Sequence, residues 1–147
     1  MPSSVVEFSD MNFLKARSFE IPLPTHVDGR GRITIVEGEH LPFAIRRVYY
    51  LSELSSGKTR GAHAHKTLEQ VLIAVSGSFD VYLSDGEREL TYRPKRHVGL
   101  YVGPYLWHEI RNCSSDAVCL MLASLPYDES DYIRDFDAFC ALVKGAK

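Results

Sequence analysis

The sequence has few cysteines, and none of them is paired in a metal-binding or redox spacing. Its 147 residues include only Cys113, Cys119 and Cys140, and no two of these form a C-x-x-C unit. An odd number of unpaired cysteines is typical of a protein in a reducing compartment. The chain also lacks a signal peptide and any apolar run near membrane length. We therefore expect a cytoplasmic protein with no membrane partner.

The sequence also has little excess charge. The net charge is −2 at pH 7 and there is no basic run, so nucleic acid is not an expected partner. No glycine-rich phosphate loop follows a predicted strand, and no Ser-His-Asp or Cys-His nucleophile arrangement is evident. There is no low-complexity segment or linker-like stretch. A chain of this length predicts one domain, spanning residues 1–147.

Short apolar segments separated by turn residues fill most of the chain. Asp85 and Gly86 stand between two alternating segments, which is a strong signal for a β-hairpin. Phe19–Pro24 contains two prolines and predicts a loop or an edge strand. Roughly nine short strands of this kind predict a sandwich or barrel. The predicted strands are Val5–Phe8, Ile33–Val36, Ala44–Leu51, Val71–Val75, Phe79–Leu83, Glu87–Tyr92, Val98–Val102, Trp107–Arg111 and Ala117–Leu125.

Near the C-terminus the apolar residues recur with a different period. Ser130 can cap a helix and Gly145 can close it. Apolar residues recur at helical spacing between them, which predicts an amphipathic helix over about residues 131–144. These apolar residues are Ile133, Phe136, Phe139 or Cys140, and Val143. We expect this helix to pack on the barrel; binding of a partner is the alternative.

A histidine pair lies in the stretch GKTRGAHAHKTLEQVLIAVSG, residues Gly57–Gly77. Residues i and i+2 of a strand point to the same face, so His63 and His65 would enter one space. Arg60 can add a fixed positive charge at the rim. Two bases that titrate near neutral pH beside a permanent cation indicate an acid–base site for an anionic substrate. Two solvated surface histidines are the simpler alternative.

The spacing of this stretch fits the first cupin motif, G-x5-H-x-H-x3–4-E-x6-G. The matching residues are Gly57, His63, His65 and Gly77. The position of the motif's carboxylate holds Gln70, and the nearest acid, Glu69, is one residue early. A neutral amide is a poorer ligand for a divalent cation than a carboxylate. We therefore predict a site without a metal or other cofactor.

The second cupin motif is partly present in GLYVGPYLWHEIRN. Gly99, Pro104, His108 and Asn112 match it, with one residue fewer than usual between its parts. The two motifs together predict an all-β fold, a cupin or double-stranded β-helix (jelly-roll) barrel with a C-terminal α-helix.

Three longer blocks carry a family resemblance. RGAHAHKTLEQVLIAVSG, GLYVGPYLWHEI and LASLPYDESDYIRDFDAF resemble sugar 3,4-ketoisomerases that act on dTDP-4-keto-6-deoxyglucose, and the elements DGRG and IRRVYYL resemble the same family. The resemblance runs from about Asp28 to the final helix. It implies a dTDP-linked 4-keto-6-deoxy sugar as substrate and a 3-keto sugar as product, for deoxyamino sugars of surface polysaccharides or natural products. It also implies a homodimer with exchanged N-terminal strands.

The resemblance implies that the histidine pair is the catalytic centre. Moving a ketone from C4 to C3 needs one proton moved between carbons and one between oxygens. We assign the carbon proton to His63 and the oxygen proton to His65. Arg60 would hold the developing oxyanion or a phosphate.

Further residues are candidates for holding the substrate. Either Arg46 or Arg47 could grip the diphosphate, and strict alternation puts them on opposite faces of one strand. His108, in the second motif, could face the interior of the barrel. The aromatic candidates for stacking on thymine are Tyr49, Tyr101, Tyr105 and Trp107, although a single aromatic is more often part of a core.

Other functions stay open on the sequence. A metal-dependent cupin would use His63, His65 and His108 as ligands, with Gln70 or Glu69 as the fourth. A non-catalytic cupin that binds a sugar nucleotide is a third reading. A 3,5-epimerase is a neighbour in chemistry that would exchange protons without moving the ketone.

Overall fold

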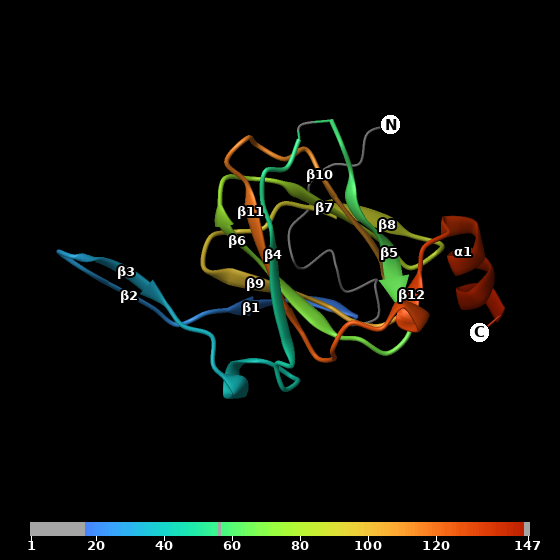
Figure 1. Cartoon of the computed structure of the whole chain (residues 1–147), viewed down its shortest axis with the longest axis horizontal. Helices are drawn as coiled ribbons and strands as arrows, with labels where there is room; N and C mark the ends of the chain where they lie inside the picture. The colour runs from blue at the N-terminus through green and yellow to red at the C-terminus, as the bar shows by residue number, and fades with distance from the viewer. Residues whose placement is uncertain (1–16, 56, 146–147) are drawn as a thin grey trace.

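The fold is built from two five-stranded antiparallel sheets that pack face to face (Figure 1). The computed structural model describes residues 17–55 and 57–145. The first sheet has the order β1 (Ser18–Pro22), β9 (Val98–Val102), β6 (Gln70–Ser76), β11 (Val118–Ala123) and β4 (Arg47–Leu51). The second has the order β12 (Tyr132–Ile133), β5 (Arg60–His65), β10 (Trp107–Arg111), β7 (Asp80–Ser84) and β8 (Glu89–Tyr92). The predicted jelly-roll barrel of the cupin type is confirmed.

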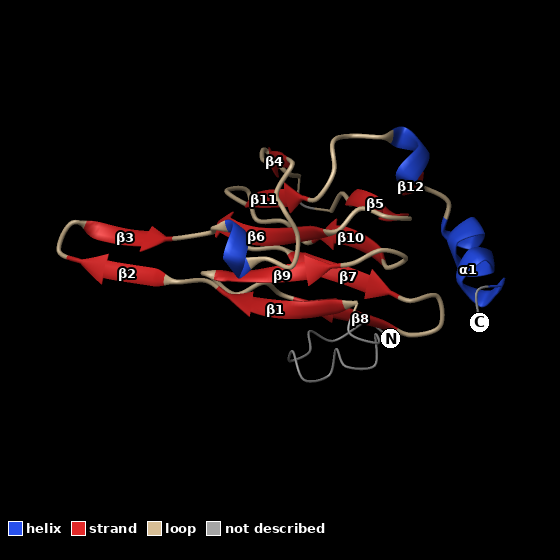
Figure 2. Ribbon diagram, turned by 90° about the horizontal axis from the view of Figure 1, so that it is seen from below, coloured by secondary structure: helices blue, strands red, loops and turns tan. Residues whose placement is uncertain are grey.

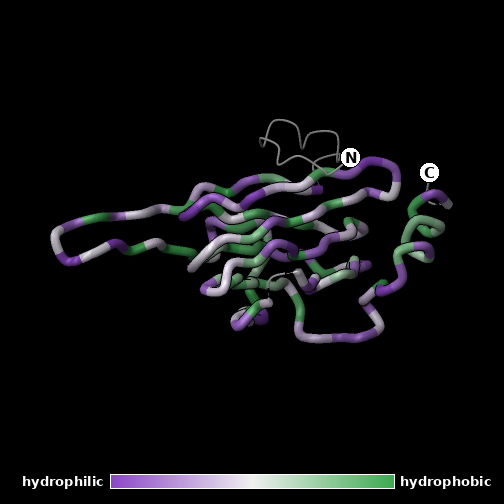
Figure 3. The backbone as a smooth tube through the Cα atoms, turned by 90° about the horizontal axis from the view of Figure 1, so that it is seen from above, coloured by the Kyte–Doolittle hydropathy of each residue, from purple (hydrophilic) through white to green (hydrophobic). Residues whose placement is uncertain are grey.

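The main core lies between the two sheets. Strand alternation sends Leu72 and Met121 of the first sheet and Leu83 and Ile110 of the second into this core. Each is nearly or completely buried. Several strands are apolar on both faces, because each sheet also has a covered outer surface. In Figure 3 the hydrophobic segments accordingly run along the strands of the barrel.

The predicted β7–β8 hairpin is confirmed. The Asp85 side chain accepts hydrogen bonds from the backbone N–H groups of Glu87 and Arg88, at 2.9 and 2.7 Å, and so closes the turn. The proline-containing segment forms β1, which lies at the edge of its sheet and pairs only with β9 among the described strands. The predicted strand Val5–Phe8 lies outside the described residues.

A second hairpin projects from the barrel. It consists of β2 (Thr25–Asp28) and β3 (Gly31–Thr34), which pair with each other and with no other described strand. Figures 1 and 2 show it extending well beyond the two sheets. Val27 and Ile33 on this hairpin are more than 60% exposed. A short 3₁₀ turn, η2 (Gly38–His40), follows it.

The C-terminal helix α1 (Phe136–Gly145) packs on the outer face of the second sheet, where Phe139 and Val143 meet Trp107. The predicted start of this helix near residue 131 is wrong. Residues before Phe136 instead form the 3₁₀ turn η3 (Glu129–Asp131) and strand β12, which pairs with β5. The cap is Asp135 rather than Ser130, since the Asp135 side chain accepts a hydrogen bond from the Ala138 N–H at 2.8 Å. In the described part of the chain, no helix has the length and apolar character of a membrane span.

Candidate active site

A cavity of about 500 Å³ opens inside the barrel, beside β4, β5 and the segment that precedes α1. Both polar and apolar side chains form its wall, and the charged ones among them are all arginines. The lining residues are Arg47, Val48, Tyr49, Leu51, Arg60, Gly61, Ala62, His63, His108, Ile110, Met121, Tyr127, Tyr132 and Arg134.

The histidine pair lies on one face of β5. His63 and His65 both point into the barrel, and their ring centroids are 4.8 Å apart in an edge-to-face arrangement. Ala64 between them points to the outer face, where it packs near α1. His63 lines the cavity, whereas His65 lies behind it and is only 2% exposed. The His63 imidazole therefore faces the cavity directly, and the His65 imidazole lies in the layer behind it.

A β-bulge places Arg60 on the same side as the histidines. Between the pairs Ile110–Arg60 and His108–His63, strand β5 has one more residue than β10. Gly61 lies in this bulge with φ of 67°, a left-handed conformation that glycine adopts without steric cost. Because of the extra residue, Arg60 and His63 both line the cavity although they are three positions apart.

His108 completes a cluster of three imidazoles. It lies opposite His63 on β10, with ring centroids 4.6 Å apart. One ring nitrogen from each of His63, His65 and His108 lies within 4.8 Å of the others. The buried Gln70 side chain contacts His108, with Gln70 Nε2 3.0 Å from His108 Nε2. The Tyr49 hydroxyl donates to Gln70 Oε1 at 3.3 Å, so the Gln70 amide N–H faces His108.

Burial keeps these imidazoles neutral. Burial lowers the pKa of His63 to about 2, helped by the neighbouring His108 and His65. Burial also lowers the pKa of His65 to about 4, although Asp131 acts in the opposite direction. The pKa of His108 falls to about 3 for the same main reason. At neutral pH each ring therefore carries one proton and offers one lone pair, as a general base requires.

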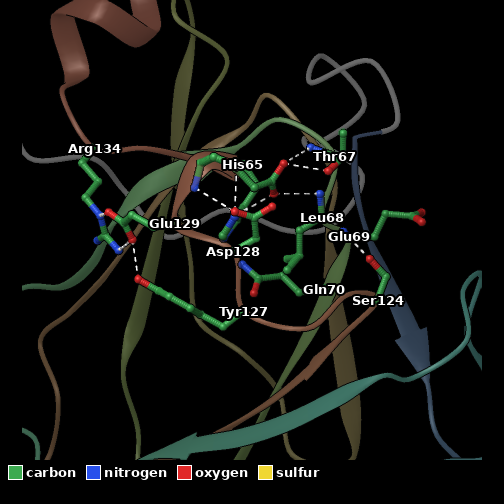
Figure 4. Close-up of polar contacts among 12 residues, drawn as sticks. His65, Thr67, Leu68, Glu69, Gln70, Ser124, Tyr127, Asp128, Glu129 and Arg134 are labelled. Atoms are coloured by element: carbon green, nitrogen blue, oxygen red, sulfur yellow. Dashed lines mark hydrogen bonds and ion pairs between the residues drawn. The ribbon is translucent and has the colours of Figure 1, made fainter.

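The three imidazoles do not form a good metal site. Gln70 donates to His108 Nε2, and His108 Nδ1 lies 3.4 Å from the Leu106 carbonyl oxygen, so both nitrogens of His108 have protein partners. Glu69 points away from His65 (Figure 4). Its carboxylate accepts a hydrogen bond from the Tyr101 hydroxyl at 2.7 Å. No carboxylate of the described residues lines the cavity. This donor set fits a proton-transfer site better than a divalent cation.

Of the two neighbouring arginines, only Arg47 reaches the cavity. Arg46 is exposed and its backbone N–H pairs with the Ala123 carbonyl. The Arg47 guanidinium lies over the rings of Tyr49 and Tyr127, 5.0 and 5.7 Å from their centroids. Its Nε and Nη2 are buried and make no hydrogen bond within residues 17–55 and 57–145. A guanidinium left in this state can accept an anionic ligand.

Three of the aromatic candidates are not brought to the cavity. Tyr101 stacks on Phe19 on the outer face of the first sheet, and Trp107 packs against α1. Tyr105 is exposed in the turn before β10. Only Tyr49 enters the barrel, where it holds Gln70. The physical reason is strand alternation, because Tyr101 and Trp107 occupy outward positions of their strands.

The sequence did not predict that the segment from Tyr127 to Arg134 lines one side of the cavity. Tyr132 contacts both His63 and His65, with ring centroids 4.8 and 4.4 Å away. Arg134 lies over the Tyr132 ring and forms two hydrogen bonds with Glu129, which also accepts from the Tyr127 hydroxyl (Figure 4). The signal is present as a run of tyrosines and charged residues in LPYDESDYIRD, but the helix predicted from Ser130 onwards includes the second half of this run.

Known proteins match most of the chain. A TDP-4-oxo-6-deoxy-alpha-D-glucose-3,4-oxoisomerase from Aneurinibacillus thermoaerophilus is 49% identical over 116 residues, which is 77% of this chain and 83% of that protein. The crystal structure of a 3,4-ketoisomerase from Helicobacter canadensis superimposes with a TM-score of 0.84 and 40% identity, covering 86% of this chain and 97% of the other.

A mutant of the 3,4-ketoisomerase QdtA from Thermoanaerobacterium thermosaccharolyticum has been solved in complex with TDP-4-keto-6-deoxyglucose. It superimposes with a TM-score of 0.85 and 37% identity over 88% of this chain and 96% of that one. The family described as "FdtA: WxcM-like, C-terminal" matches residues 17–144. The chain therefore belongs to the FdtA family.

Proposed function

We propose that this protein is a 3,4-ketoisomerase that converts TDP-4-keto-6-deoxyglucose into a TDP-3-keto-6-deoxyhexose. The observation that carries the proposal is the cluster of neutral imidazoles at the wall of a cavity whose charged lining groups are arginines. Neutral imidazoles can take and return protons, and the arginines suit a diphosphate. The relatives with this activity support the substrate assignment.

The reaction needs only proton transfers. A base removes the proton at C3, and the electron pair forms the C3–C4 double bond while the C4 oxygen gains a proton, giving an enediol. A proton then returns to C4, and the C3 hydroxyl loses its proton as the C3 ketone forms. We assign the carbon proton to His63, which lines the cavity, and the oxygen proton to His65 behind it.

The arginines serve the anionic parts of the substrate. Arg47 would bind the diphosphate, because two of its nitrogens are buried and lack a hydrogen-bond partner in the described part of the chain. Arg60, at the bulge beside His63, would stabilise the negative charge that develops on oxygen in the enediol. A bound dianionic diphosphate would also raise the pKa of the nearby imidazoles towards neutrality, which makes them stronger bases.

The same assignment suggests an oligomeric state, a compartment and a use for the product. We expect a homodimer, because the projecting β2–β3 hairpin exposes Val27 and Ile33 while Val48 and Tyr50 are exposed on β4. Apolar side chains exposed on this scale favour an interface with another chain. The three cysteines are unpaired thiols, which suits a cytoplasmic enzyme. The product would be a precursor of deoxyamino sugars for polysaccharides.

The test is proton NMR of TDP-4-keto-6-deoxyglucose incubated with the protein in deuterated water. The expected result is a 3-keto product with deuterium at C4 and exchange at C3. His63→Asn and His65→Asn should fold, bind TDP and lose about 10²–10⁴-fold in rate. If His63 is the carbon base, its variant should also lose exchange at C3, while the His65 variant exchanges slowly without turnover. The opposite pattern would exchange the two roles, and near-normal turnover in both variants would contradict the mechanism.

A further inference from the structure

Asp131 is a buried acid beside the catalytic pair that the mechanism above does not use. Strand β12 pairs Tyr132 with His65, which sets Asp131 next to the imidazole. His65 Nδ1 lies 3.4 Å from Asp131 Oδ2, a contact that is longer than a full hydrogen bond. Asp131 is 9% exposed and His65 is 2% exposed. The contact is therefore shielded from water.

The protein holds this carboxylate in a fixed position. Asp131 Oδ1 accepts hydrogen bonds from the backbone N–H and the hydroxyl of Thr67, at 2.8 and 2.6 Å, and Oδ2 accepts from the Leu68 N–H at 3.1 Å. Figure 4 shows Thr67 and Leu68 beside His65. Burial acts to raise the pKa of Asp131, but these hydrogen bonds hold it below its usual value. The acid is therefore ionised and cannot rotate away from His65.

Both ring nitrogens of His65 are buried, and neither makes a full hydrogen bond to a described residue. Nδ1 faces the Asp131 carboxylate at 3.4 Å, whereas Nε2 faces no such acceptor. One ring nitrogen of His65 lies within 4.8 Å of a ring nitrogen of His63 and of His108. A carboxylate at Nδ1 favours the tautomer with the proton on Nδ1, which leaves the lone pair on Nε2.

We propose that Asp131 is a positioning residue that fixes the Nδ1–H tautomer of His65, so that Nε2 is the nitrogen that exchanges protons in the site. This role rests on the proposed isomerase function. The long contact in the ligand-free protein agrees with it, since hydrogen bonds of catalytic groups often shorten only when substrate binds. A purely structural role, in which Asp131 only ties residues 66–68 to the segment before α1, is the competing explanation.

The variant that separates these roles is Asp131→Asn. Its carbonyl can keep the two hydrogen bonds from Thr67, which leaves an NH₂ group in the place of Oδ2, facing His65 Nδ1 and no longer accepting from the Leu68 N–H. That NH₂ group donates, so the proton of His65 should move to Nε2. Asp128→Asn is the matched control, because Asp128 lies in the same segment and accepts from Ser130 rather than from a histidine.

The first readout is the tautomer of His65 by ¹⁵N NMR of histidine-labelled protein without substrate. We expect Nδ1–H in the wild type and Nε2–H in Asp131→Asn. The wild-type measurement needs no variant to fold, and an Nε2–H tautomer in the wild type would overturn the proposal. Because no substrate is present, this result stands or fails independently of the isomerase assignment.

The second readout compares turnover with binding. In Asp131→Asn, kcat should fall by about 10²–10⁴-fold, as for other acids that orient a catalytic histidine. The dissociation constant for TDP should stay within about threefold, and Asp128→Asn should keep both values. A folded Asp131→Asn protein with near-normal kcat would contradict the positioning role and show that Asp131 has only a structural role. Thermal unfolding of both variants measures any loss of stability independently of kcat and TDP binding.

Discussion

The neutral imidazole cluster should make the stability of this protein depend strongly on pH. The pKa values of His63, His65 and His108 are lowered to about 2, 4 and 3, so all three stay neutral in the folded protein at pH 5. In the unfolded chain the same groups titrate near pH 6.5. The unfolded chain therefore binds more protons as the pH falls, and stability that is complete above about pH 6.5 is lost below it.

The size of the effect follows from these values. Between pH 7 and pH 5, each neutral imidazole should remove about 2 kcal/mol from the free energy of unfolding, and the three together about 6 kcal/mol. This is comparable with the whole stability of a typical domain, about 5–15 kcal/mol. Urea unfolding at pH 7, 6 and 5, followed by fluorescence of Trp107 at one protein concentration, measures the loss.

Single variants separate the histidines from the carboxylates that titrate in the same range. His65→Asn should reduce the loss between pH 7 and pH 5 by about 2 kcal/mol, because carboxylate contributions cancel in the comparison with wild type. His26→Asn is the control, since His26 is exposed on the projecting hairpin. An identical pH dependence in wild type and His65→Asn would refute the conclusion that His65 is held neutral.

Two further predictions concern the ligands of the site. Arg47→Ala should weaken TDP binding by roughly 1–3 kcal/mol in calorimetric titration, whereas Arg46→Ala, which removes the outward-facing neighbour, should leave the affinity unchanged. Equal losses in both variants would point to long-range charge rather than a contact. The purified protein should contain no stoichiometric Fe, Mn or Zn by elemental analysis and should keep its activity in chelator. Gln70→Glu, which places a carboxylate beside His108, is the matched variant that should gain affinity for divalent cations.

Much of the fold could be predicted because it depends on local patterns. The alternating segments around Asp85 and Gly86 predicted the β7–β8 hairpin, and the apolar segment after His65 predicted β6. The start of the helix could not be predicted in this way. Ser130 has the chemistry of a cap, but Tyr132 and Ile133 gain backbone pairing with β5, and this tertiary contact outweighs local helix signals.

The sequence by itself determined the chemistry of the site. The i, i+2 spacing of His63 and His65 requires a shared face once β5 is a strand, and Gln70 takes the place of a metal-binding carboxylate. Only the tertiary structure decided which other residues join them. The bulge at Gly61 directs Arg60 into the cavity, and pairing of β12 with β5 brings Asp131 and Tyr132 to His65. These contacts come from pairing of β5 with β10 and β12, strands far apart in the chain, so backbone pairing within the second sheet sets them rather than any local period.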